Sequence, residues 1–380
     1  MADIRSIFGQ HGKSYLTRYG PNMLPSHRRA INDIIQCRTW AMGGHVESCT
    51  HCDHVNYVYH SCGSRSCPRC RKKVAEEWVE KRGRELLPVP YFHVVFTVPQ
   101  ELRDIIRSNQ KTLLSVQMKA AGNSLLKLCE DDKYVGGKVG LLSVLHTWTS
   151  AMIYHPHVHC LIPGGGYDKS RQRWTTSRST FLVPVKALSV IYRAKFRDMV
   201  QASAPELNIP ASVWQKDWVV YCKPVLQGPR KVLQYLGRYV QRSAISDSRI
   251  IGVENGIVHF RYKETAKQKN KWQRKWQTMD LPVFEFMRRF LQHVLPSGFH
   301  KVRYYGLLSP ANRKLLHQMQ MLLADPVTEA DLLDLEKEIT ATLIEDEKIC
   351  RCCNKGTMKV LGRLPKMYPS MTRAPPVTML

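Results

Sequence analysis

The residues best suited to chemistry in this chain are two histidines and two tyrosines. His157 and His159 flank a single apolar residue, and Tyr235 and Tyr239 follow further along. Alternate side chains of a β-strand point to one face, so the two imidazoles project together and supply half of a divalent-metal site. Residues four apart on a helix also share a face, which brings the tyrosines together. This set predicts a nuclease in which tyrosine attacks a phosphate.

The remaining ligands of this metal site stay open. His155 is one candidate, although Pro156 alters the strand beside it. Gln241 is another, although its two-residue offset from Tyr239 turns it to a different helix face. A residue elsewhere in the chain is the third alternative, and Tyr235 could be a packing residue that leaves Tyr239 as the sole nucleophile. The glycine run at residues 164–166 allows close approach of backbone or ligand.

The cysteines predict structural zinc. Six of the twelve lie between Cys37 and Cys70, and no secretory signal precedes them, which favours metal ligands over disulfides. Two C-x-x-C knuckles separated by 14 residues would complete one tetrahedral site, formed by Cys49, Cys52, Cys67 and Cys70. Ligands for a second zinc, or alternative ligands of the first, are Cys37, His45, His60 and Cys62. Cys350-x-x-Cys353 is half a site with no visible partner.

The charge balance predicts a polyanionic partner. The chain carries 57 Lys+Arg against 31 Asp+Glu, a formal net charge of +26, which favours nucleic acid. Arg238 and Arg242 are expected to contact phosphate, with a solvated helix face as the alternative. Lys271, Arg274 and Lys275 alternate with two tryptophans and suit single strands, unless those tryptophans face a helical core. Arg65 and Arg69 flank a zinc knuckle and are expected to hold phosphates.

Periodicity predicts an α+β fold with a central antiparallel sheet flanked by helices. Strands are expected at 91–98, 140–148, 158–162, 181–183 and 218–221, and 257–262 could close the sheet. Helices are expected at 72–87, 102–129 (as one helix or two), 185–203, 229–242, 285–294 and 328–347, the last as a packing or dimer element. No apolar run is long enough to span a bilayer. We therefore expect a cytoplasmic, nucleoid-associated protein with no membrane partner.

Composition shifts divide the chain into four parts. Residues 1–88 form a zinc-binding DNA-recognition domain, and 91–262 form the catalytic domain. Residues 263–362 form a basic, mostly helical region. Residues 363–380 form a proline-containing tail that we expect to be disordered.

Three blocks in the same order resemble one known family. They are "CRTWAMGGHVESCTHC…SCGSRSCPRC", "HPHVHCLIPGGG" followed by "YLGRYVQR", and "FMRRFLQHVLPSGFHKVRYYGLL". Together they are similar to the HUH endonuclease superfamily, in particular to the rolling-circle, IS91-like insertion-sequence transposases. The resemblance covers roughly residues 25 to 310, and it implies an HUH-nuclease core preceded by a zinc-binding domain.

The resemblance also implies a mechanism and partners. His157 and His159 would hold Mg²⁺ or Mn²⁺, and the family's two-tyrosine pattern maps onto Tyr235 and Tyr239. The expected activity is cleavage and rejoining of single-stranded DNA at element ends and target through a 5′-phosphotyrosine, and a homodimer is compatible with it. The rival hypotheses are a rolling-circle replication initiator and a non-catalytic zinc-finger regulator. The regulator hypothesis would leave the histidine and tyrosine pairs without a role.

Overall fold

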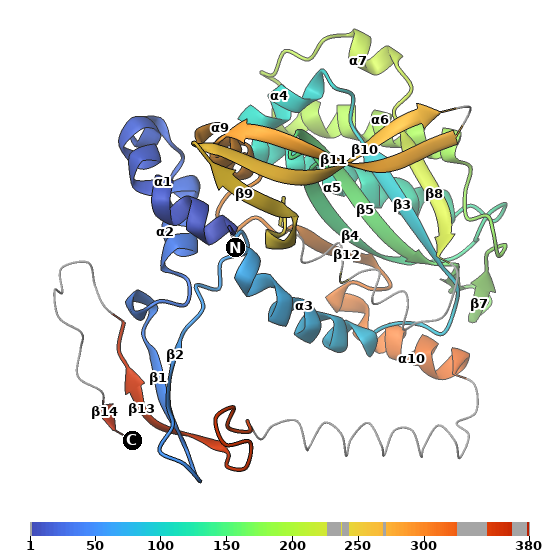
Figure 1. Ribbon diagram of the computed structural model, residues 1–380. Coiled ribbons are helices and arrows are strands. Elements are labelled where there is room, and N and C mark those ends of the chain that lie inside the picture. The colour runs from blue at the N-terminus through green and yellow to red at the C-terminus, as the bar shows by residue number, and fades with distance from the viewer. Residues whose placement is uncertain are drawn as a thin grey trace.

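The computed structural model describes residues 2–225, 237, 243–268, 271–324, 348–366 and 378–379. Figure 1 shows a helical pair on one side, a twisted β-ribbon below it, and a large sheet flanked by helices. The pair consists of α1 (Ile4–Tyr19) and α2 (Pro25–Gln36), and α1 begins with a capping box made by Asp3 and Ser6. No helix in the described part of the chain is long and apolar enough to cross a membrane.

The central sheet has five strands in the order β12-β4-β5-β3-β8, and every neighbouring pair is antiparallel. This confirms the predicted α+β class. Its strands are β3 (Tyr91–Thr97), β4 (Gly140–Trp148), β5 (Tyr154–Pro163), β8 (Val220–Val225) and β12 (Val302–Gly306). The helices around it are α4 (Leu102–Ser108), α5 (Gln110–Cys129), α6 (Val185–Ser203) and α7 (Ser212–Gln215).

The two faces of this sheet are covered differently because side chains alternate along each strand. One face carries Phe92, Val94, Phe96, Val158 and Cys160, all fully buried in one large core with side chains of α5 and α6. The opposite face carries a smaller apolar cluster around Tyr91, Leu142, Val144 and Leu161, against which Trp78 of α3 (Pro68–Gly83) packs. The histidines of interest lie further along this second face.

The glycine run after β5 serves backbone packing. A Cβ on Gly165 would lie 2.4 Å from the Trp174 indole nitrogen, and one on Gly166 would lie 2.8 Å from the Gly137 carbonyl carbon. These glycines join β5 to a small hairpin formed by β6 (Gly165–Asp168) and β7 (Arg173–Thr176). The predicted strand at 181–183 is a turn with a single bridge between Arg178 and Phe181.

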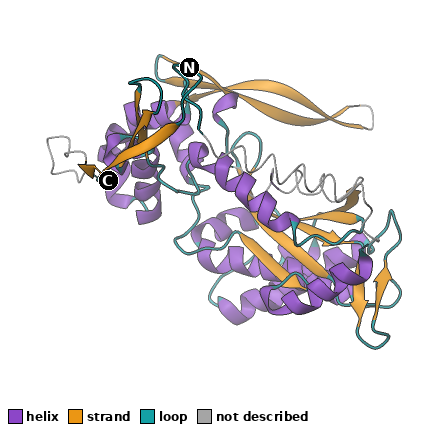
Figure 2. Ribbon diagram, turned by 90° about the horizontal axis from the view of Figure 1, so that it is seen from below, coloured by secondary structure: helices purple, strands orange, loops and turns teal. Residues whose placement is uncertain are grey.

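The structure after residue 250 differs from the prediction. Strand β10 (Ile257–Gln268) does not close the central sheet; it lies between β9 (Ile250–Glu254) and β11 (Lys271–Pro282) in a separate sheet. The basic stretch predicted as mostly helical therefore begins with a long hairpin, seen in Figure 2 as an extended two-stranded arm. Helices resume at α9 (Val283–Leu291) and α10 (Arg313–Leu323).

The C-terminal part of the chain returns to the N-terminal ribbon. Strand β13 (Met358–Leu364) pairs with β1 (Gly44–Cys49), which also pairs with β2 (Val55–Tyr59), and β14 (Thr378–Met379) adds an edge to β13. The predicted disordered tail therefore begins too early, because residues 363 and 364 belong to a strand. The helix predicted at 328–347 and residues 367–377 lie outside the described residues.

Candidate active site and zinc sites

Three histidines converge on the open face of the central sheet. His146 comes from β4, and His157 and His159 come from β5; one ligand nitrogen from each lies within 4.8 Å of the others. The antiparallel register places His146 directly opposite His157. Neighbouring strands therefore aim the three imidazoles at one point, and three imidazole nitrogens are a donor set that divalent transition metals accept.

Outer hydrogen bonds orient two of these rings. The Nδ1 of His157 lies 2.7 Å from the carbonyl oxygen of His155 and donates to it. The Nδ1 of His159 lies 2.9 Å from the Nε2 of His93 on β3, a side chain that is only 5% exposed. Both contacts leave Nε2 to face the cluster, as metal-bound histidines usually require.

Burial favours the neutral form of His157 and of two histidines beside it. Desolvation lowers the pKa of His157 to about 4, and burial likewise lowers the pKa of His93 and of His155 to about 4. Neutral imidazole is the form that binds metals, so His157 is ready to bind a cation near pH 7. The donor set of the cluster fits a divalent transition metal.

His146 is the residue that sequence reasoning missed. Of the alternatives left open, His155 lies outside the cluster and accepts a hydrogen bond through its backbone, and Gln241 lies outside the described residues. A signal for His146 exists in the sequence. A hairpin made from the strands predicted at 140–148 and 158–162 would bring position 146 close to the start of the second strand, where His157 and His159 lie.

The tyrosine segment lies almost entirely outside the described residues, including Tyr235, Tyr239, Arg238 and Arg242. Gly237 is described, is helical, and lies against α3: a Cβ added to it would stand 2.7 Å from Cγ2 of Val79. The neighbouring residue Trp78 packs on the sheet face that carries the histidines. Gly237 therefore lies beside the helix that borders this face.

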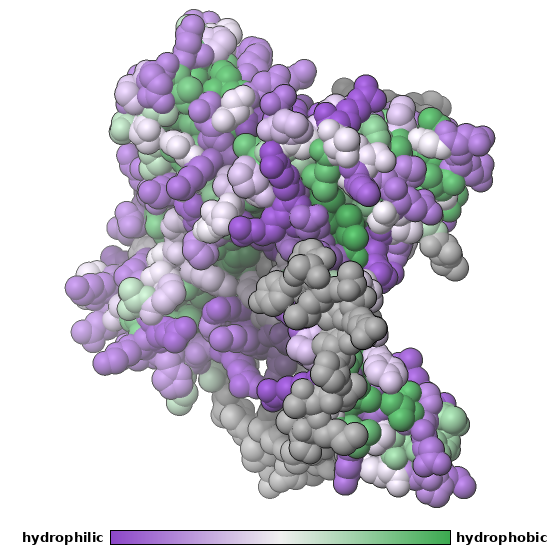
Figure 3. Space-filling model, turned by 90° about the vertical axis from the view of Figure 1, so that its left-hand side faces the viewer, coloured by the Kyte–Doolittle hydropathy of each residue, from purple (hydrophilic) through white to green (hydrophobic). Residues whose placement is uncertain are grey.

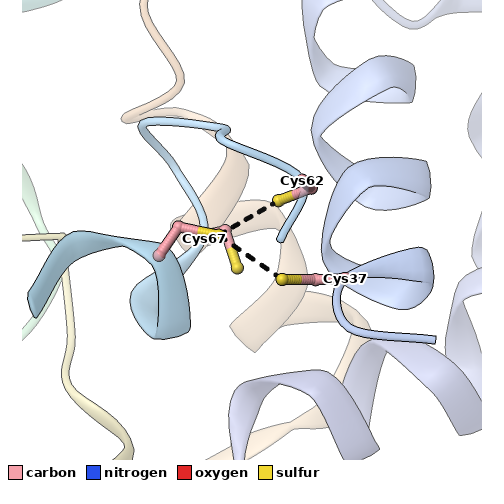
Figure 4. A group of neighbouring side chains, drawn as sticks. Cys37, Cys62 and Cys67 are labelled. Carbon is pink, nitrogen blue, oxygen red and sulfur yellow. Dashed lines mark hydrogen bonds between the residues drawn. The ribbon is translucent and has the colours of Figure 1, made fainter. Parts of the chain in front are cut away.

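Four cysteines gather where α2, the loop after β2 and the start of α3 meet. They are Cys37, Cys62, Cys67 and Cys70, and all their sulfurs lie within 4.8 Å of one another. The sulfur of Cys70 is 3.4 Å from that of Cys37 and 3.5 Å from that of Cys62. Figure 4 shows Cys62 and Cys37 pointing toward Cys67 from separate segments. Tetrahedral zinc with Zn–S bonds of about 2.3 Å needs sulfurs about 3.8 Å apart, so this cluster fits the ion.

The two knuckles do not share one zinc site. Cys49 and Cys52 lie with Cys350 and Cys353 instead, in a second four-cysteine group. The predicted pairing of Cys49 and Cys52 with Cys67 and Cys70 is therefore corrected, because equal spacing does not say which knuckles meet in space. His45 belongs to neither group, since its Nε2 contacts Glu47 at 3.0 Å.

The basic residues fall into two groups. Arg65 and Arg69 serve the fold: the Arg65 guanidinium donates to the Pro296 carbonyl at 2.6 Å, and Arg69 pairs with Asp3 at 2.5 Å. On the β10–β11 arm, Lys275 is exposed, while the side chains of Lys271 and Arg274 are outside the described part. Trp276 is 56% exposed with the Lys263 ammonium 4.8 Å from its ring centre, so it does not face a core.

Comparisons with known proteins agree with this architecture. Residues 7–98 match the family described as "Transposase zinc-binding domain", and residues 140–315 match the family described as "Putative transposase". A bacterial tRNA(His) guanylyltransferase-like structure aligns with 58% of this chain at 10% identity and a TM-score of 0.20, which supports no conclusion about fold or function.

Two curated relatives cover most of the chain. The putative transposase y4qJ of Sinorhizobium fredii is 34% identical over 382 residues, spanning 94% of each chain. The transposase for insertion sequence element IS801 of Pseudomonas savastanoi pv. phaseolicola is 27% identical over 308 residues, and the match spans 74% of this chain and 70% of the IS801 transposase. These matches confirm the predicted family: the chain belongs to the IS91-like transposases with an N-terminal zinc-binding domain.

Proposed function

We propose that this transposase cleaves and rejoins single-stranded DNA through a covalent 5′-phosphotyrosine. The observation that supports it most is the cluster of His146, His157 and His159 on an open sheet face. A bound Mg²⁺ or Mn²⁺ would polarise the scissile phosphate and stabilise developing charge. A DNA-binding regulator without catalysis has no use for such a cluster, and the family matches favour transposition over replication initiation.

The chain's own residues would hold and orient this centre. His146, His157 and His159 offer the ligand nitrogens, while His93 and the His155 carbonyl fix the ring orientations. Because the β5 ligands are spaced two apart on a rigid strand, their geometry does not depend on loop ordering. His93 is therefore a positioning residue rather than a catalytic one.

Tyr239 is the proposed nucleophile and Tyr235 the second tyrosine. The tyrosine oxygen forms a bond to phosphorus while the bond from phosphorus to the 3′ oxygen breaks, and that oxygen leaves as a 3′-OH after taking a proton. The reverse step, with a different 3′-OH as attacking group, rejoins the strands without ATP. The position of Gly237 beside α3 supports this assignment, since Gly237 lies between the two tyrosines in sequence.

DNA is the proposed partner, single-stranded where it is cut, at element ends and target. A net charge of +26 supplies the attraction for phosphates, and Lys263, Lys275 and Trp276 on the arm offer charge and a stacking surface. Arg238 and Arg242 flank Tyr239 in sequence and remain proposed phosphate ligands, as do Lys271 and Arg274. A homodimer would let two chains hold two element ends.

The first zinc site is proposed to stabilise the domain that presents α3. Cys37, Cys62, Cys67 and Cys70 would hold one structural Zn²⁺, and Cys67 is the N-cap of α3, the helix that reaches the nuclease sheet. This ion would link α2 and α3 rigidly.

The test is a covalent-adduct assay on the full chain. Wild type, Tyr239→Phe, Tyr235→Phe and the double variant are incubated with Mn²⁺ and 5′- or 3′-labelled single strands carrying element ends, then resolved on denaturing gels. We expect an adduct in wild type that retains the label on the 3′ side of the cut, strong loss in Tyr239→Phe, and none in the double variant. An undiminished adduct in the double variant would place the nucleophile elsewhere.

A further inference from the structure

We propose that Cys49, Cys52, Cys350 and Cys353 bind a second structural Zn²⁺. This ion would join the N-terminal β1–β2 ribbon to the C-terminal segment that contains β13. The matched zinc-binding family covers residues 7–98 and so contains only half of these ligands. The other half comes from a segment some 300 positions away, since Cys49 and Cys353 are 304 residues apart. The zinc-binding domain would thus be completed by the C-terminal segment.

The sulfur positions fit zinc and exclude disulfides. The Cys49 and Cys353 sulfurs lie 3.6 Å apart, and those of Cys52 and Cys350 lie 3.8 Å apart. A tetrahedral Zn²⁺ with Zn–S bonds of about 2.3 Å separates its sulfurs by about 3.8 Å, whereas a disulfide bond is about 2.05 Å long. All four cysteines are free thiols.

Each knuckle is also built as a thiolate-binding turn. Backbone N–H groups of His51 and Cys52 approach the Cys49 sulfur at 3.3 and 3.4 Å. In the other knuckle, the Cys352 N–H approaches the Cys350 sulfur and the Gly356 N–H approaches the Cys353 sulfur, both at 3.4 Å. Such N–H···S contacts orient metal-binding sulfurs and stabilise their charge.

The knuckles lock together tightly around Gly356. A Cβ at this position would lie 2.6 Å from the Cys49 sulfur and 2.7 Å from the His51 Cβ, so only glycine fits. Thr50 and Thr357 exchange hydrogen bonds between the two turns at 3.0 Å. The two half-sites are therefore complementary to each other.

The pairing continues from the zinc ligands along the ribbon. Cys49 pairs with Met358 and Gly44 with Leu364, so β13 runs the full length of β1. Beside it, the Lys348 ammonium contacts both carboxylate oxygens of Glu47, at 2.6 and 2.8 Å. A ribbon this small has little hydrophobic core to stabilise its third strand, β13. A bound Zn²⁺ would therefore provide much of the free energy that keeps β13 paired with β1.

Zinc stoichiometry of the full chain tests this site. We expect two Zn²⁺ per chain in wild type by elemental analysis and one in Cys350→Ser/Cys353→Ser. Cys352→Ser is the matched control because Cys352 is exposed and lies outside the cluster, so it should retain two. Limited proteolysis should cut within 348–366 much faster in the double variant only.

Two results would overturn the proposal: one zinc in wild type, or two zincs in the double variant. If the double variant does not fold, Co²⁺-substituted wild type decides. Two equivalents of tetrahedral, thiolate-bound Co²⁺ in its absorption spectrum support two four-cysteine sites, and a single equivalent refutes the second.

A different observation carries a second inference, which rests on the proposed function. We infer that a groove between α1, α4 and α9 binds the phosphate backbone of single-stranded DNA beside the nuclease site. Two adjoining cavities of about 750 and 300 Å³ share Arg107, Arg288 and Gln292 in their walls. Figure 3 views the side of the molecule on which α1 and α2 lie, and the described surface there is largely hydrophilic.

The groove is strongly cationic. Its walls contain five arginines (Arg18, Arg103, Arg107, Arg288 and Arg289) against the two carboxylates of Asp104 and Glu285. Glu285 is bound by Arg288 at 2.6 and 2.9 Å and by Arg289 at 2.8 Å. Among the described residues, no carboxylate forms a salt bridge with Arg18, Arg103 or Arg107. Three cations therefore remain for phosphates.

The wider cavity adds aromatic surface. Tyr15 and Tyr19 lie with ring centres 4.8 Å apart, and Phe284 stands edge-on to Tyr15 at 5.4 Å. Tyr19 is 40% exposed and carries the Arg18 guanidinium 5.3 Å from its ring centre. An arginine beside the exposed Tyr19 ring suits the backbone and unpaired bases of a single strand.

The narrower cavity leads toward the metal cluster. It is lined by Ile153 and by Tyr154, the first residue of β5, which precedes His157 by three residues. The next residue after Tyr154 is His155, whose ring centre is 5.3 Å from that of His157. A strand held by Arg103 and Arg107 would therefore pass the start of β5, the strand that carries His157 and His159.

Binding and cleavage are measured separately to test this groove. Fluorescence anisotropy with an oligothymidylate reports affinity for Arg103→Ala/Arg107→Ala. The matched control is Arg84→Ala/Arg197→Ala, which removes two arginines on other surfaces. We expect about tenfold weaker binding and a salt dependence reduced by about 1.4 in slope for the groove variant alone.

The possible outcomes distinguish a failure of the proposed DNA-binding groove from a failure of the proposed cleavage reaction. Equal affinities of groove variant, control and wild type would refute the groove, even where wild type forms the covalent adduct. Absence of the adduct in wild type would refute the proposed cleavage, whatever the affinity. A groove variant that binds weakly while the control is unchanged supports the inference.

Discussion

The hydrogen bond from His159 to His93 should contribute to the metal affinity of the proposed site. Replacing His93 by Leu removes the acceptor 2.9 Å from the His159 Nδ1 and leaves a buried N–H unsatisfied, which costs about 1–3 kcal/mol. Losing such an outer contact lowers metal affinity about 10–100-fold, equivalent to about 1.4–2.7 kcal/mol. The two estimates agree, so we expect a loss in this range.

Isothermal titration of the full chain with Mn²⁺ measures this loss directly. His93→Gln should recover much of the affinity because its amide oxygen can accept from His159. His300→Leu changes an exposed histidine and is the control. Thermal unfolding curves would show whether the variants remain folded. If folded His93→Leu bound Mn²⁺ as tightly as wild type, the argument that His93 positions His159 would be wrong.

Three further predictions concern the site, acid stability and the arm. His146→Ala should abolish adduct formation while single-strand binding measured by anisotropy persists, whereas His155→Ala should keep activity because its imidazole lies outside the cluster and its backbone carbonyl still accepts from His157; an active His146→Ala would exclude this ligand. Burial lowers the pKa of His293 to about 3, so its neutral form stabilises the fold above pH 6.5 and that stability is lost as pH falls toward 3. At pH 5.5 the loss is about 1.4 kcal/mol, and His293→Gln should flatten the unfolding-versus-pH curve, which an unchanged slope would contradict. Trp276→Ala should weaken binding of single strands by about 1–3 kcal/mol through lost stacking, and an equal effect on duplex DNA would argue against stacking.

Much of the nuclease core could be predicted because its elements bury regular apolar patterns. The predicted bounds of β4 and α6 agree with the structure, and the stretch 102–129, predicted as one helix or two, forms α4 and α5, which meet at Asn109. Strand β5 begins at Tyr154, four residues before the predicted start at 158. The structure accommodates Pro156 opposite an irregularity in the register between His146 and Trp148, where the missing N–H breaks no regular ladder.

The features that sequence reasoning missed depend on contacts between distant segments. A C-x-x-C knuckle has the same local spacing whichever partner it has, so only the pairing of β1 with β13 shows that Cys49 meets Cys353. The basic hairpin was expected to be mostly helical because neither of its strands shows a clear apolar period. Exposed residues such as Lys275 and Trp276 explain this, since a solvated arm has no buried face to impose alternation.

The register between β4 and β5 decides whether the proposed metal site exists. His146 opposes His157 on one face, while Leu145 opposes Val158 on the other, where both are almost fully buried in the core beneath α5. A slip of one residue would turn every side chain of one strand to the opposite face. The two imidazoles of β5 cannot enter that apolar core without losing their hydrogen-bond partners, so hydrophobic burial on the far face enforces the geometry of the histidine cluster on the near one. Mutations of the core face, such as Val158→Thr, should therefore reduce metal affinity as well as stability, whereas a mutation that lowered stability equally from α1 should leave metal affinity of the folded protein unchanged.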